Sequence, residues 1–252
     1  MKKEKYGVGA IFKTTEGCDI EIIEKLKGIY RVVEFKDKMK HKVKTNCSAI
    51  RRGSISNPYH PSFCGIGYFG VGEFEASING VKTKEYHVWS GMLRRCYDTA
   101  IIFKNPTYEN CTVCVEWCNF QTFAKWYNNN YPNIYGIKFH LDKDLLQQYD
   151  RNKIYSPETC VFLPQGINVF LANKKSYNTS GYIGASWHKS NKKWTSSICL
   201  FGEGKPKHLG HFTTPELASI SYQQARVIES EKAKQYLRDL NYLPENIIQL
   251  VR

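Results

Sequence analysis

Hydrophobic and polar positions alternate over short stretches near the start of the chain. The alternation runs through residues 19–22 and 29–35, with breaks at Gly17, Gly28 and Asp37. A period of two is typical of a half-buried strand, and glycines mark turns between strands. Residues 7–53 are therefore predicted to form a small twisted antiparallel sheet or barrel.

Helical spacing replaces the alternation in the middle of the chain, after a Gly- and Pro-rich stretch over residues 57–72 that predicts a loop. Residues 86–97 place Trp89, Leu93 and Tyr97 at four-residue intervals. Residues 113–127 carry an aromatic stripe of the same kind, so two helices are expected, each with its aromatic face in a core. A β-type stretch at 137–144 and an apolar run at 161–164 predict strands after them.

Three further strands and a helix are predicted in the last part of the chain. The strands cover residues 182–189, 193–200 and 207–212, and a polar stretch at 173–180 is expected to connect them to the region before. Thr214, Pro215 and Glu216 form a strong helix start, because Thr is a good N-cap, Pro fits the first turn and an acid favours the helix N-terminus.

Composition narrows the class of protein. The 252 residues contain 36 Lys and Arg against 23 Asp and Glu, a net charge of +13, and 42% are hydrophobic, which excludes a disordered basic tail. Residues 1–70 hold 14 basic and 7 acidic side chains, so +7 of that charge lies there. Such a balance indicates a polyanionic partner, above all nucleic acid.

Location and redox state follow from the same counts. Apolar runs fall short of the roughly 18–20 residues of a membrane span, no secretory signal is recognisable, and the nine cysteines do not form an even disulfide framework. We expect a cytoplasmic protein with no membrane partner.

The last region resembles the APETALA/ERF-type DNA-binding domain. The resemblance rests on GASWHK, KKWTSSI, HLGHF and TPELASISYQQA in that order and covers about residues 181–240. It implies that a three-stranded sheet lies in the major groove of DNA with a helix behind it.

Strand parity then assigns the two faces of this sheet. Trp187, Trp194, Ile198 and Leu209 are expected on the helix side. The opposite, DNA-contacting face is predicted to carry Ser186, His188, Thr195, Ser197 and His208, with Lys189, Lys192 and Lys193 at its margins.

The middle region resembles the HNH-type (ββα-metal) module of phage homing endonucleases over residues 86–173. The motifs are W-x2-M-x2-RCY from Trp89, V-x-W-x2-F-x2-F-x2-W from Val115, LDKDLL, and YSPETCVFLP. The resemblance implies one Mg²⁺ or Mn²⁺ ion, a general base and hydrolysis of a DNA phosphodiester. Asp142 takes the first ligand position and Asn168 the helix ligand position.

The general base of this module is open between two residues. Lys143 stands where the family has its catalytic His, and a lysine acts as a base only if its pKa falls far below about 10.4, which Asp142 and Asp144 oppose. His140 is the other candidate, because residues 140, 142 and 144 are predicted to share one face of an extended strand. In that register Asp144 is a further candidate metal ligand.

Cysteines offer a rival, zinc-type metal site. Cys111, Cys114 and Cys118 have zinc-compatible spacing, with Cys96 or Cys160 as a fourth ligand. Buried core thiols are the alternative interpretation of the same residues.

Together these patterns predict an α+β chain of three modules: a small basic β-rich module (1–72), an HNH-like module (73–175) and an APETALA/ERF-type DNA-binding domain (176–252). The chain resembles phage-encoded proteins of the homing-endonuclease type, which implies a bacterial host cytoplasm and nicking or cutting of double-stranded DNA. The alternative is a non-catalytic DNA- or protein-binding factor, such as a regulator or a phage counter-defence protein. The basic first module is expected to add phosphate contacts or to bind an acidic protein.

Overall fold

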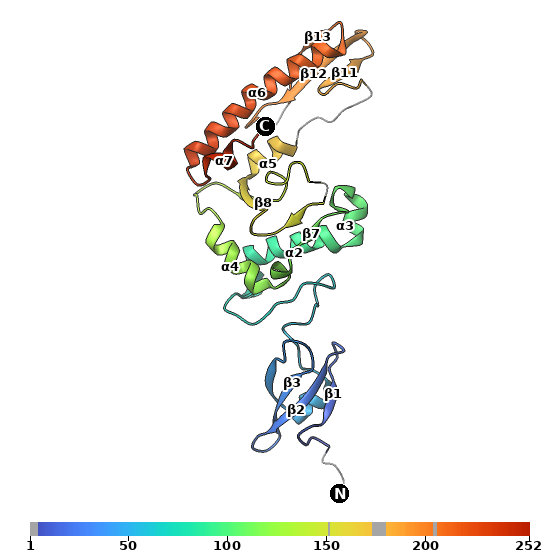
Figure 1. The fold of residues 1–252 in the computed structure, drawn as a ribbon, viewed down its shortest axis with the longest axis vertical. Coiled ribbons are helices and arrows are strands. Elements are labelled where there is room, and N and C mark those ends of the chain that lie inside the picture. The colour runs from blue at the N-terminus through green and yellow to red at the C-terminus, as the bar shows by residue number, and fades with distance from the viewer. Residues whose placement is uncertain (1–4, 151, 173–179, 204–205) are drawn as a thin grey trace. The chain divides into compact units, whose positions relative to one another are not determined.

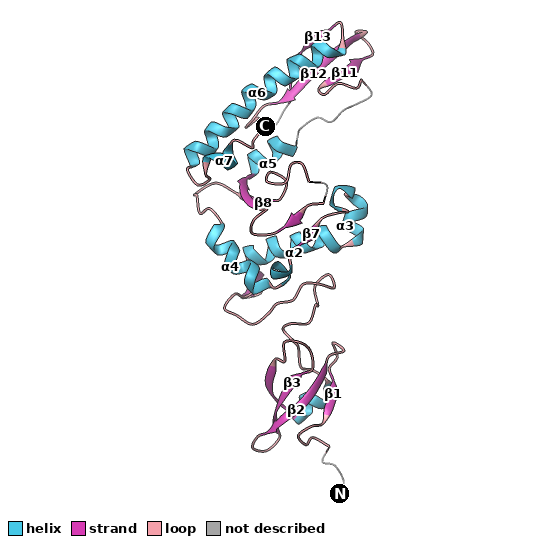
Figure 2. Ribbon diagram, viewed as in Figure 1, coloured by secondary structure: helices cyan, strands magenta, loops and turns pink. Residues whose placement is uncertain are grey.

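The computed structural model describes residues 5–150, 152–172, 180–203 and 206–252, so most of the predicted 173–180 connection lies outside the described residues. The chain divides into two compact units, residues 1–129 and 130–252. Figure 1 labels the helices and strands of both along the chain. Helices and strands are interspersed in both (Figure 2), which confirms the α+β class.

The first unit begins with an antiparallel four-stranded sheet. Strands β1 (Ile11–Lys13), β2 (Asp19–Lys25), β3 (Tyr30–Phe35) and β4 (Lys42–Asn46) pair in chain order, and the short helix α1 (Cys47–Arg52) follows. Alternate residues of the central strands point into one core, as the period of two predicted. This core comprises Ile20, Ile22, Val33, Phe35, Ile50 and Ile55.

The rest of the first unit is largely helical. A hairpin of β5 (Ser77–Ile78) and β6 (Val81–Lys82) leads into α2 (Lys84–Tyr97) and α3 (Thr99–Lys104). The 3-10 turn η1 (Pro106–Tyr108), strand β7 (Thr112–Val113), 3-10 turn η2 (Val115–Cys118) and α4 (Phe120–Asn130) follow. Trp89 of α2 is fully buried and donates from Nε1 to the carbonyl oxygen of Trp117 at 2.8 Å.

The prediction of a single helix over residues 113–127 is wrong for the first half of that range. The α-helix begins at Phe120, because Asn119 has an extended backbone and its side-chain oxygen accepts the N–H of Gln121 at 3.0 Å. Trp117, Phe120 and Phe123 are nevertheless all buried, since a 3-10 turn followed by a helix preserves nearly the same spacing.

The second unit starts with two strands and a helix. Strand β8 (Phe139–Asp142) pairs antiparallel with β10 (Val161–Pro164), with β9 (Ile154–Tyr155) between them in sequence. Helix α5 (Gln165–Ala172) follows β10 without a connecting loop. We call β8, β10 and α5 the ββα element. All four residues of β10 are buried.

A three-stranded antiparallel sheet comes next, made of β11 (Ala185–His188), β12 (Lys193–Cys199) and β13 (Pro206–Phe212). Helix α6 (Pro215–Leu240) begins with Thr214 as its N-cap and packs on one face of the sheet, as predicted. The approach is close: Gly184 has a φ of +77°, and a Cβ there would lie 2.2 Å from the ring of Tyr222.

A β-bulge interrupts the pairing of β12 with β13. Ser196 pairs with Gly210 and Ser197 with His208, so Leu209 has no partner. Gly210, with a φ of +142°, is the residue type that such a bulge favours. The extra residue shifts the parity of β13 on either side of it.

Two side chains depart from the core that strand parity predicted on the helix side. Trp187 is 49% exposed because it lies on the edge strand, where its ring meets that of Trp194 edge to face (ring centroids 5.2 Å apart). Leu209 is only half-buried, since it occupies the bulge. Trp194 is half-buried and Ile198 is buried.

The second half of α6 packs in another hydrophobic core. It packs, with α7 (Glu245–Ile248) and the chain end, against the ββα element. The buried residues of this core are Leu145, Val161, Leu163, Ile167, Phe170, Ala233, Leu237, Ile248 and Val251. One helix therefore packs on both the three-stranded sheet and the ββα element.

The described residues contain no helix with both the length and the apolar character needed to cross a bilayer.

Candidate functional site

The ββα element brings together two of the residues predicted to bind a metal. Asp142 is the last residue of β8, where it pairs with Val161, the first residue of β10. Helix α5 starts at the far end of β10, and its start is tied back to the region before β8 by a bond from Gln165 N–H to the Lys138 carbonyl oxygen (2.9 Å). The helix thereby carries Asn168 to the same pocket as Asp142.

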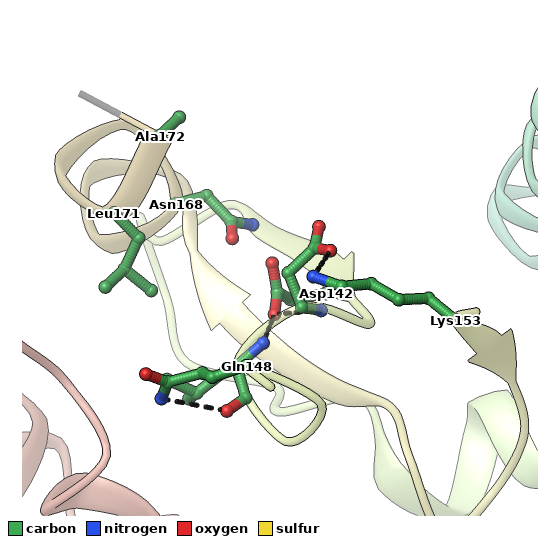
Figure 3. Close-up of a pocket in the computed structure, with 8 residues that line it drawn as sticks. Asp142, Gln148, Lys153, Asn168, Leu171 and Ala172 are labelled. Atoms are coloured by element: carbon green, nitrogen blue, oxygen red, sulfur yellow. Dashed lines mark hydrogen bonds and ion pairs between the residues drawn. The ribbon is translucent and has the colours of Figure 1, made fainter. Parts of the chain in front are cut away.

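This pocket has a volume of about 340 Å³. In Figure 3 the amide of Asn168 and the carboxylate of Asp142 project into the same space from different elements. Its described lining residues are Asp142, Asp144, Leu145, Gln148, Lys153, Asn168, Leu171 and Ala172.

Asp142 turns the chain at the end of the strand. Its Oδ1 accepts the backbone N–H groups of Asp144 at 3.0 Å and Leu145 at 2.7 Å. Burial raises the pKa of the Asp142 carboxyl above its ordinary value, although these two hydrogen bonds act in the opposite direction. A neighbouring cation would offset that burial cost, which is the usual setting of a carboxylate metal ligand.

The prediction that residues 140, 142 and 144 share one strand face is wrong. Strand β8 ends at Asp142, because the side chain of Asp142 takes up the next backbone donors and bends the chain.

Asp144 accepts hydrogen bonds from two lysines. Its Oδ1 lies 2.9 Å from Nζ of Lys143 and also bonds Nζ of Lys153. Burial by itself would raise the pKa of Asp144, but the hydrogen bonds and charges of the two lysines dominate and lower it. Asp144 is therefore ionised, and the ammonium groups of the two lysines balance its negative charge.

The two candidate general bases are His140, within β8, and Lys143, directly after it. Lys143 is only 4% exposed, bonds Asp144 and lies with Nζ 5.7 Å from the ring centre of Tyr155. His140 is half-buried on β8, opposite Leu163. Neither belongs to the described lining of the pocket.

The chemistry of the donors fits a hard divalent cation. Asp142 offers a carboxylate and Asn168 an amide oxygen, and Mg²⁺ is commonly held by one or two such ligands with water completing its shell. Asp144 fits less well, because two ammonium groups already bond its carboxylate. No three His, Cys, Asp or Glu side chains gather as a metal site within the described ranges.

Sequence reasoning did not single out Lys153 or Gln148, which complete the polar lining of the pocket. Lys153 lies just before β9 and reaches Asp144 across nine residues. A basic residue near an acidic pair was the available signal, but one lysine among many in this chain is not distinctive.

The predicted DNA-contacting residues lie on the sheet face opposite α6. Ser186 pairs with Thr195 and His188 with Lys193, and Ser197 pairs with His208 across the next strand pair. Lys189 and Lys192 lie in the β11–β12 hairpin. Of the eight side chains assigned to this face and its margins, Thr195 and Ser197 are half-buried, and the other six are exposed: Ser186, His188, Lys189, Lys192, Lys193 and His208.

His211 also belongs to this face and was missed. It pairs with Thr195, on the far side of the bulge from His208. Strict alternation would have separated residues 208 and 211, whereas the extra residue brings them to the same face.

Four of the zinc candidates, Cys96, Cys111, Cys114 and Cys118, lie in the first unit as free thiols, whereas Cys160 is a buried free thiol of the second unit. Burial raises the pKa of Cys114 to about 11 and also raises that of Cys118. Cys111 donates to the Thr107 carbonyl oxygen and Cys118 to that of Cys114, at 3.7 and 3.6 Å. Cys96 is buried in α2. These surroundings favour protonated core thiols, whereas zinc requires thiolates.

No family model, curated protein or solved structure matches this chain.

Proposed function

We propose that this protein binds double-stranded DNA through the exposed face of the β11–β12–β13 sheet and cleaves it in a divalent-metal-dependent reaction at the Asp142 pocket. The observation that carries the proposal is the joint position of Asp142, at a strand end, and Asn168, on the following helix, in one pocket. The HNH resemblance of residues 86–173 implies this pair of positions.

Each pocket residue has a distinct role in this proposal. Asp142 and Asn168 would hold Mg²⁺ or Mn²⁺, and the bound ion would supply Lewis-acid stabilisation of the scissile phosphate and of the leaving 3′-oxygen. Lys153 keeps Asp144 paired, so that the pocket does not present two unbalanced carboxylates to a phosphate. His140 is the candidate base that accepts a proton from water.

A second candidate function is DNA binding without cleavage. The specific observation in its favour is that neither His140 nor Lys143 belongs to the described pocket lining, and that Lys143 is buried in an ion pair. A ββα element that has lost its base would keep its fold and its DNA contacts.

Plasmid nicking decides between the two functions. Supercoiled DNA is incubated with the full chain in Mg²⁺, in Mn²⁺ and in EDTA, and open-circle product is measured on a gel. The nuclease proposal requires nicking that disappears in EDTA. Unchanged supercoiled DNA with each ion, on a plasmid that the protein demonstrably binds, leaves the binding function.

Single substitutions then identify the base. We expect His140→Ala to lower the nicking rate about a hundredfold, the size of a lost general base. Lys143→Ala is expected to act mainly on stability, because its ammonium group is buried against Asp144. Rates are compared after circular dichroism has shown folded protein. A larger rate loss in folded Lys143→Ala would make Lys143 the base instead.

A double substitution tests the DNA-binding face. Lys189→Ala with Lys193→Ala should weaken duplex binding and flatten its dependence on salt, by roughly 0.9 in the log–log slope for each lost phosphate contact. Fluorescence anisotropy at several salt concentrations gives the slope. Lys104→Ala with Lys125→Ala removes the same charge from exposed positions of the first unit and serves as the control. Equal slopes for wild type and the Lys189/Lys193 variant would place DNA binding outside this sheet.

A further inference from the structure

Three of the seven histidines lie together on the exposed sheet face. His188 comes from β11, and His208 and His211 come from β13. The ring centroids of His188 and His211 are 5.4 Å apart, and those of His208 and His211 are 4.7 Å apart. All three side chains are exposed. We call them the histidine cluster.

Neutral neighbours position each ring. The backbone N–H of Asn191, in the β11–β12 hairpin, donates to Nδ1 of His188 at 3.3 Å, and its side-chain amide lies 3.1 Å from Nε2 of His211. The hydroxyl of Thr195 lies 3.3 Å from Nδ1 of His208.

The charges around the cluster are mostly positive. Desolvation lowers the pKa of His211 below its ordinary value, and the charges of His208, His188 and Lys193 lower it further. The same strands and hairpin also carry Lys189, Lys192 and Lys207. Glu203 is the carboxylate in the described part of the β12–β13 connection, beyond the opposite end of β12 from Lys193.

A bound polyanion reverses this balance. Imidazoles that repel one another when protonated become favourable cations once phosphates lie over them, so binding and protonation reinforce each other. By linkage, each proton taken up on binding changes the affinity by as much as tenfold per pH unit. The gain is present below the pKa values of the bound rings and vanishes at pH values above them, where the rings are neutral in both states.

We propose that the histidine cluster binds DNA phosphates in its protonated form, so that DNA binding by this sheet takes up protons and strengthens as the pH falls. The inference rests on the proposed DNA-binding function but needs no cleavage. It deepens that function, because it makes the sheet a pH-dependent phosphate-binding surface in addition to its lysines.

The test measures affinity for a fluorescein-labelled 30-base-pair duplex of random sequence at pH 6.0 and 8.0. Ionic strength is held constant and EDTA excludes adventitious metal ions. The wild-type chain is expected to bind at least about tenfold more tightly at pH 6.0, with a steeper salt dependence there, since each protonated ring adds a phosphate contact.

Glutamine variants assign the effect to the cluster. The triple variant His188→Gln, His208→Gln and His211→Gln keeps polar side chains on the face and should lose most of the pH dependence, while its affinity at pH 8.0 stays within about threefold of wild type. The matched control is the triple variant His41→Gln, His60→Gln and His87→Gln, which removes as many imidazoles from the first unit and should keep the wild-type pH dependence. Calorimetry in two buffers of different ionisation enthalpy counts the protons taken up.

Each failure has its own signature. Equal wild-type affinity at the two pH values, or a glutamine variant of the cluster that keeps the full pH dependence, overturns the inference and leaves DNA binding intact. If the wild type binds no duplex at either pH in low salt, the proposed DNA-binding function fails, and the inference fails with it.

Discussion

Replacing Asp142 by Asn is expected to abolish metal-dependent nicking while leaving DNA affinity equal or slightly higher. Asp142 is the carboxylate ligand in the proposed metal pair, and Mg²⁺ binds weakly to neutral ligands alone. Asn keeps an oxygen that can accept the N–H groups of Asp144 and Leu145, so the turn after β8 is preserved. In a binding assay with EDTA, where no metal ion occupies the site, removing a negative charge near phosphate cannot weaken DNA binding electrostatically.

The measurement is a plasmid-nicking time course with a binding assay on the same preparations. Asp142→Ala should also be inactive but less stable, since it loses the turn as well as the ligand. Asp150→Asn, an exposed position in the same β8–β9 connection, is the matched control and should nick at the wild-type rate. Nicking by folded Asp142→Asn at a rate near that of wild type would remove Asp142 from the metal site.

Leu237→Ala is expected to destabilise the second unit by about 2–5 kcal/mol, the cost of a cavity at a fully buried leucine. Leu237 lies in the second half of α6, in the core that also holds Leu163 and Ile167. Because α6 also packs on the three-stranded sheet, the loss should destabilise the ββα element and the sheet in one transition.

Urea unfolding followed by circular dichroism and tryptophan fluorescence measures the effect. Leu217→Ala is the same substitution on the same helix, but at a side chain that is 47% exposed, and it should cost less than about 1 kcal/mol. A Leu237→Ala protein with wild-type stability, or with a sheet that unfolds separately from the ββα element, would contradict the packing of α6 on both.

The joint core also bears on domain organisation. The boundary predicted near residue 175, after the HNH-like module, stays a prediction. Residues that follow it in sequence contribute to the core of the ββα element, namely Ala233, Leu237, Ile248 and Val251. Arg226 strengthens this connection from the middle of α6. Its guanidinium carbon lies 3.6 Å from the ring centre of Phe170. The Nη1 group of the same side chain donates to the Phe170 carbonyl oxygen at 3.1 Å.

Local sequence patterns were sufficient to predict those features of the structure that depend on residues close together in sequence. Alternation predicted the burial of Ile20, Ile22, Val33 and Phe35, because side chains of a strand alternate between its faces whatever it pairs with. The cap at Thr214 depends on residues within one turn, and it too was predicted from sequence. The resemblance to the HNH-type module singled out Asp142 and Asn168, and their metal role stays a prediction.

Longer-range pairing decided the rest of the candidate site. Whether a lysine faces solvent or a buried partner depends on what packs over it, so the burial of Lys143 against Asp144 was not predictable from neighbouring residues. The bend after β8 ended a strand that propensity alone would have continued to residue 144.

By itself the sequence determined the core-facing alternation of the first sheet, the three strands and the helix of the last region, and the strongly positive charge, since these follow from residue types at short spacing. Only the tertiary structure placed His211 beside His208 and His188, because a bulge opposite Ser196 and Ser197 changes the parity of β13. Only the tertiary structure showed that α6 packs in two hydrophobic cores. An amphipathic pattern shows that a helix face is buried, but it does not show which element covers that face. The neighbours of His211 and the packing partners of α6 are determined by contacts between segments far apart in sequence, and these contacts form only when the chain folds.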